Sequence, residues 1–152
     1  MNNFENEPQV PHGFTARIPP KPKRDVLFCM VDASCFESSS GITEDVEIGI
    51  MSITCNEQIE CAKMAEQGNN TSLTIELTKF CLRFWRPASL PQRIKINHAN
   101  MEQETYWSLL GARGQDVATA AFVRQNRAID TDSGPKPVAK MRSTFQTEAL
   151  DV

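Results

Sequence analysis

The fold is decided where the periodicity changes, in the stretch Val46-Glu47-Ile48-Gly49-Ile50-Met51-Ser52-Ile53-Thr54-Cys55-Asn56-Glu57. Its aliphatic side chains alternate up to Ile50, which is the period of a strand with one face on a core. Thr54 and Glu57 then have the spacing of a capping box, in which each side chain caps an amide of the first helical turn. We therefore predict a strand that leads into a helix ending at Gly68, where a left-handed residue costs little.

The residues before this stretch predict a second strand and an arm. The run 26–31, Val26-Leu27-Phe28-Cys29-Met30-Val31, is apolar and of strand length, and a turn-rich segment, 38–41, follows it. A small antiparallel hairpin or sheet is the expected result. Residues 1–25 contain five prolines, which favour extended geometry, so we expect an N-terminal arm there.

The residues after it predict more helices. A second helix should begin within 69–72 and continue to Pro87, because apolar residues recur at helical spacing: Leu73, Leu77, Phe80, Cys81 and Phe84. A basic loop, 87–99, follows, with a short strand at 93–96. Two further helices are expected over 101–110 and 115–126, the first ended by a glycine.

These elements together predict an α+β fold. A small antiparallel hairpin or sheet precedes a bundle of about four short helices, flanked by extended N- and C-terminal arms. We expect one domain over 26–127, the arm over 1–25 and a C-terminal tail over 128–152 with one apolar anchor, Phe145.

Composition limits the classes of function. The chain has 152 residues, a net charge of −3 and a pI near 5.4, so no overall charge attracts it to nucleic acid or anionic membranes. A signal-peptide pattern is missing at the N-terminus, and we expect a cytoplasmic protein. The odd number of cysteines then indicates free, mostly buried thiols: Cys29, Cys35, Cys55, Cys61 and Cys81.

The sequence carries no motif for catalysis, a cofactor or a metal. Only His12 and His98 are available to pair with a nucleophile or to complete a metal site, and the cysteine spacings are not those of zinc knuckles. Phosphate-binding glycine loops are also missing. We therefore predict a protein that is not an enzyme, with no catalytic residue, no cofactor and no metal.

The predicted contact residues are Phe84, Trp85, Arg86 and Trp107. Aromatic and Arg side chains dominate binding hot spots in protein interfaces. Three alternatives stay open. Phe84 lies in the core and Trp85 caps a helix end, or Trp107 packs between two helices. In the third, the aromatic side chains and the neighbouring basic residues stack on single-stranded nucleic acid.

Charge is unevenly distributed along the chain. Acidic residues far outnumber the single base, Lys63, between Asp32 and Glu66, whereas basic residues outnumber the single acid, Glu76, between Ser72 and Ile96. Patches of opposite charge on different faces of the molecule favour head-to-tail association of subunits. Ordinary charge variation is the alternative.

Residues 46–126 resemble the tail assembly chaperones and related small tail-morphogenesis proteins of tailed bacteriophages. The resemblance is carried by the strand and capped acidic helix from Ile48 to Glu60, by the second amphipathic helix, and by the segment Tyr106-Trp107-Ser108-Leu109-Leu110-Gly111-Ala112-Arg113-Gly114-Gln115 that leads into a closing helix. The long proline-rich arm, the basic loop 87–99 and the numerous cysteines depart from the pattern.

The resemblance implies a non-enzymatic protein that binds the tape measure protein while tail tube subunits polymerise around it. Its expected location is the host cytoplasm during assembly. A structural virion component of tail, baseplate or head, held by its arms among neighbouring subunits, is the alternative. A small nucleic-acid-binding protein is a third hypothesis.

Overall fold

The computed structural model describes residues 22–67, 72–127 and 145–152. In chain order the elements are β2 (Arg24–Val31), β3 (Val46–Met51), α1 (Cys55–Gln67), α2 (Leu73–Cys81), β4 (Leu82–Pro87), β5 (Ile94–Lys95), α3 (Glu102–Arg127) and β6 (Gln146–Leu150). Two short 3-10 turns, Ala33–Cys35 and Ser38–Ser40, connect β2 to β3. The α+β class is confirmed.

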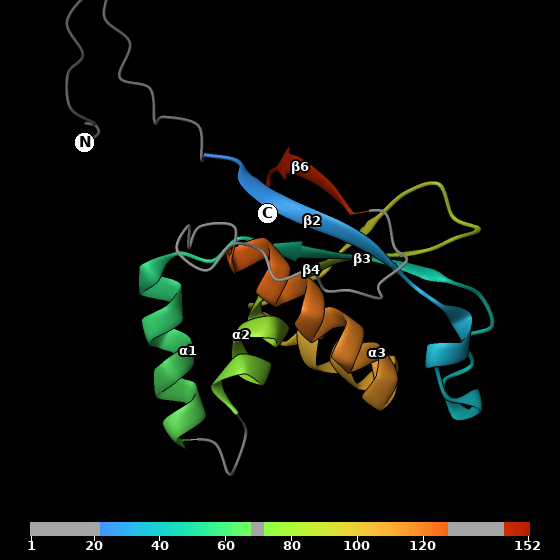
Figure 1. The fold of residues 1–152 in the computed structure, drawn as a ribbon, viewed down its shortest axis with the longest axis horizontal. Coiled ribbons are helices and arrows are strands. Elements are labelled where there is room, and N and C mark those ends of the chain that lie inside the picture. The colour runs from blue at the N-terminus through green and yellow to red at the C-terminus, as the bar shows by residue number, and fades with distance from the viewer. Residues whose placement is uncertain (1–21, 68–71, 128–144) are drawn as a thin grey trace, which may run out of the picture.

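The strands form one antiparallel sheet in the order β5-β4-β3-β2-β6. The predicted hairpin is its centre, where β2 and β3 pair with Cys29 opposite Ile48. Two further strands extend the pairing beyond β3, and β6 pairs with the other side of β2. The three helices lie on the same side of the sheet (Figure 1).

Each face of the sheet has its own aromatic cluster. On the helix side, the Trp85 ring lies 5.0 Å from the ring of Tyr106, at the start of α3. On the opposite side, the rings of Phe28 and Phe84 lie 5.7 Å apart, on either side of Gly49. A Cβ atom at Gly49 would come within 2.6 Å of the Phe28 ring, so only glycine fits between these rings.

The loop between β4 and β5 covers part of the face opposite the helices. The guanidinium of Arg93 stacks 3.5 Å from the centre of the Phe28 ring. It also donates to Glu47 of β3 at 3.0 Å and to Glu148 of β6 at 2.9 Å. Since β5 and β6 are opposite edges of the sheet, this one side chain connects elements that the strand order separates.

The capping box predicted before α1 is confirmed. The Thr54 amide donates to the Glu57 carboxylate at 2.9 Å, and the Glu57 amide donates to the Thr54 hydroxyl at 3.2 Å. Arg24 of β2 also donates to this carboxylate, at 2.6 Å. The capping residue of α1 therefore fixes the helix to the sheet as well.

The second predicted helix is too long. It ends at Cys81, and residues 82–87, predicted as its last turns, form β4. Phe84 fits the helical stripe from Leu73, but pairing with β3 satisfies the backbone groups of this segment and buries its aromatic rings on both faces. Tertiary pairing therefore outweighs local periodicity, as it commonly does.

The prediction of about four helices is also wrong, because the described residues contain three. The two helices expected over 101–110 and 115–126 are parts of α3. Gly111 interrupts it with φ 67° and ψ 176°, a backbone conformation open almost only to glycine. The predicted break is therefore real, but the chain resumes helical geometry directly after it.

The predicted bounds of the N-terminal arm and of the C-terminal tail differ in part from the structure. Residues 1–21 lie outside the described residues, but β2 begins at Arg24, inside the arm predicted over 1–25. The tail predicted over 128–152 ends in β6, which pairs with β2 from Gln146 to Leu150. Phe145 anchors that strand, because the Arg124 guanidinium stacks 4.4 Å from its ring centre.

Candidate functional site

Three of the four predicted contact residues lie in the core. Phe84 is 7% exposed, Trp85 4% and Trp107 7%. Trp85 contacts Tyr106 and packs edge-on against Phe36, with the ring centres 6.1 Å apart. Side chains this buried offer almost no surface to a partner. Phe84 lies in the core, as one alternative held, but Trp85 does not cap a helix end, because it lies within strand β4.

Arg86, the fourth predicted contact residue, is held by an ion pair. Its Nε donates to Oε1 of Glu47 at 3.0 Å, and the same oxygen accepts from Arg93. Burial alone would raise the pKa of Glu47, but the hydrogen bonds and charges of these two arginines outweigh it and lower the pKa. Arg86 is thus bound within its own chain.

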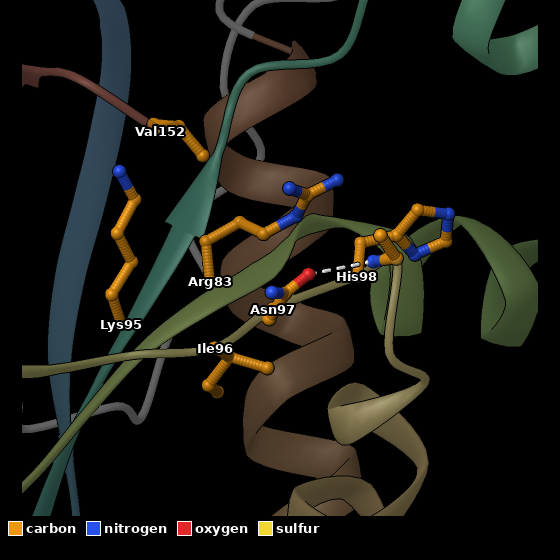
Figure 2. Close-up of a pocket in the computed structure, with 7 residues that line it drawn as sticks. Arg83, Lys95, Ile96, Asn97, His98 and Val152 are labelled. Carbon is orange, nitrogen blue, oxygen red and sulfur yellow. Dashed lines mark hydrogen bonds between the residues drawn. The ribbon is translucent and has the colours of Figure 1, made fainter.

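An open pocket that the sequence did not predict lies beside the start of β4. It has a volume of about 510 Å³. The lining residues come from β4, from β5 with the segment after it, and from the residue that follows β6 by two positions: Arg83, Lys95, Ile96, Asn97, His98, Ala99 and Val152 (Figure 2). Because these segments are far apart in the sequence, no local pattern reveals the pocket.

Backbone contacts fix the polar wall of this pocket. The Ile96 amide donates to the Arg83 carbonyl at 2.8 Å, which holds the segment after β5 against β4. The Asn97 side chain accepts from the Ala99 amide at 2.9 Å (Figure 2), and the Asn97 amide donates to Glu102 of α3. The turn that carries His98 is therefore braced on both sides.

His98 separates this pocket from a smaller hollow. The hollow, about 10 Å³, lies between α1, α2 and α3 and also has His98 in its wall. The His98 ring packs edge-on against Phe80 with centres 4.4 Å apart, and its Nδ1 is buried without a hydrogen-bond partner in the described part of the chain. Burial, and then the charge of Arg83, lower the pKa of His98, so the imidazole is neutral at pH 7.

Helix α1 offers a different kind of surface. It stands at one end of the helix layer and packs mainly on α2 (Figure 1). On α1 the side chain of Cys61 is buried, whereas that of Ile59 is 55% exposed and that of Met64 is 44% exposed. Leu73, at the start of α2, is 44% exposed. Ile59 and Leu73 therefore leave apolar surface exposed on this helical pair, whereas Met64 also lines the small hollow between the helices.

The cysteines agree with the expectation of free, mostly buried thiols. Cys29, Cys61 and Cys81 are buried. Burial, reinforced by the charge of Glu47, raises the pKa of Cys29 to about 12, and burial raises that of Cys61 to about 11. These thiols are protonated at neutral pH and therefore poor nucleophiles.

Comparisons of the chain with protein-family models, curated proteins and solved structures found no match. Within residues 22–67, 72–127 and 145–152, no His, Cys, Asp or Glu side chains gather in a group of three or more that could bind a metal ion. The helices of those same ranges are too short or too polar to cross a bilayer.

Proposed function

We propose that this chain is a non-enzymatic protein that binds another protein during bacteriophage tail assembly, in the manner of a tail assembly chaperone. The resemblance of residues 46–126 to that family supports the phage setting. The exposed apolar side chains of α1 support binding by contact. Ile59 carries the proposal, because it is a large β-branched side chain that is 55% exposed on α1 and would lose water contact on binding a partner.

The partner we propose is an amphipathic helix with a basic flank, as a segment of a tape measure protein would provide. An apolar helix face pairs with exposed apolar side chains by helix-in-groove contact. Glu60 and Glu66 are exposed on α1 beside the single base Lys63, so the surface favours a partner with Lys or Arg next to its apolar stripe. Because Ile59 is 55% exposed, covering its exposed part would contribute about half of the roughly 1.5–3 kcal/mol of a fully buried isoleucine.

Affinity capture from cells that produce the phage tests the proposal. A tagged full chain should capture a tail protein, either the tape measure or a tube subunit, identified by mass spectrometry. Capture of proteins unrelated to the tail, or of none, would reject the proposed function. Mass spectrometry of purified particles adds the second distinction: a chaperone should be absent from them, whereas a virion component of tail, baseplate or head should be present at a symmetric copy number.

A further inference from the structure

Two buried polar atoms belong to residues that line the same small hollow. Within the part of the chain that the structure describes, His98 Nδ1 and Gln103 Oε1 are the buried side-chain atoms without a hydrogen-bond partner. Both residues line the hollow between α1, α2 and α3. Gln103, in the first turn of α3, is 3% exposed, so bulk solvent does not reach its side chain. A buried polar atom that has lost water without gaining a bond destabilises the fold. Two such atoms at one hollow therefore indicate a site for a polar molecule.

The charges in the wall of the hollow favour a neutral occupant. Lys79 of α2 pairs with Glu104 of α3 at 2.8 Å and lies 3.6 Å from Glu76, and all three residues line the hollow. An anion would meet the two carboxylates, and a metal ion would meet the ammonium group. The described residues also contain no group of side chains that could bind a metal ion. The occupant should therefore carry no charge.

We propose that the hollow binds one water molecule, which bridges Gln103 Oε1 and His98 Nδ1 and connects α3 to the turn that precedes it. The volume of about 10 Å³ is at the lower end of the roughly 10–15 Å³ that one water needs, so a larger ligand does not fit. The amide oxygen only accepts hydrogen bonds, so the water donates to it. The neutral imidazole accepts the second water hydrogen at Nδ1 in one tautomer and donates to the water oxygen in the other. Water can therefore complete both bonds in either case.

This hydration site does not depend on the proposed function. Ile59, which carries partner binding, does not line the hollow. The water acts within the fold instead, because its two proposed partners lie on the turn after β5 and on α3.

Water–protein NOE and ROE spectroscopy of the full chain tests the site. The reporters are the ring protons of Phe80, which is 8% exposed and lines the hollow. We expect cross-peaks to water whose NOE and ROE have opposite signs, because a bound water stays longer than the hydration water of the surface. The ring protons of Phe122, which is 6% exposed on α3 and outside the hollow, are the internal control and should show no such cross-peak.

Gln103→Met keeps the length of the side chain but removes the acceptor oxygen, and it should lose the Phe80 cross-peak while the Phe122 ring shifts stay unchanged. Gln125→Met is the matched control, since it makes the same change at another buried position of α3 outside the hollow and should retain the cross-peak. Both variants keep Lys79, whose ammonium group exchanges protons with solvent and imitates a bound water.

Three results would reject the site. The wild-type chain shows no water cross-peak at Phe80 beyond that at Phe122, or both variants lose the cross-peak equally. In the third, the cross-peak persists unchanged in Gln103→Met, which would assign it to exchanging protons of Lys79 or His98.

Discussion

At the scale of single residues, the main lesson comes from Trp85. Aromatic and arginine residues are common in interfaces, but they are also common in cores, and sequence alone does not distinguish the two. The strand pairing shows that Trp85 belongs to the core, because Trp85 lies opposite Ile48 and turns toward Tyr106 of α3. Arg86, one residue on, turns toward Glu47 on the other face. Adjacent residues of a strand therefore have different roles.

Trp85→Ala should unfold more easily because it leaves a large cavity between the sheet and α3. We expect a loss of about 3–5 kcal/mol in the free energy of unfolding, measured by urea denaturation. Leu90→Ala is the control, since Leu90 is 45% exposed, and its cost should stay within about 0.5 kcal/mol. A Trp85→Ala protein as stable as the parent would contradict the buried position.

His98 gives a pH prediction at the same scale. Burial and the charge of Arg83 lower its pKa below the ordinary 6.5, while Glu60 and Glu57 act in the opposite direction more weakly. The folded chain thus binds this proton less readily than the unfolded chain. The stability contributed by neutral His98 is present above pH 6.5 and is lost as pH falls through the folded pKa.

Proton NMR of the imidazole, assigned with His98→Gln, measures this pKa directly. We expect a midpoint below 6.5. The His98→Gln protein should also lose less stability than the parent between pH 7 and the folded pKa. A midpoint at or above 6.5 would show that the ring is not shielded from water by Phe80 and its neighbours.

At the scale of elements, local signals predicted what local contacts stabilise. The capping box at Thr54, the β2–β3 hairpin and the break at Gly111 depend on residues close in sequence, and all three are present. Local patterns predict helix for β4 and tail for β6, because the strands with which these two segments pair lie far away in the chain. The same separation hid the pocket, although the basic character of residues 83–95 was visible in the sequence.

Gly111→Ala tests the break within α3 by the sign of its effect. In a continuous helix, replacing Gly by Ala stabilises by about 1 kcal/mol. At φ 67° and ψ 176° an alanine is strained instead, so we expect destabilisation of about 1–3 kcal/mol in thermal or urea unfolding. Ala112→Gly, at the next position, provides the comparison for an ordinary helical site. A stabilised Gly111→Ala protein would show that α3 is continuous.

At the scale of the whole molecule, most of the large side chains that the sequence singled out stabilise the fold. Their burial on both faces of the sheet, with Arg93 connecting β2, β3 and β6, accounts for the core. The outer side of α1 remains, where Ile59 is exposed. If the protein acts by binding tail proteins, this surface rather than the Phe84–Trp85 segment should make the contact.

The most direct measurement is therefore quantitative capture of the tail partner by wild-type chain and by Ile59→Asp, compared by mass spectrometry. Gln58→Asp, which adds the same charge at the neighbouring exposed position, is the control for charge alone. We predict that Ile59→Asp reduces capture at least about tenfold, equivalent to 1.4 kcal/mol, with the unfolding midpoint unchanged. Equal capture by wild type, Ile59→Asp and Gln58→Asp would contradict α1 as the binding surface.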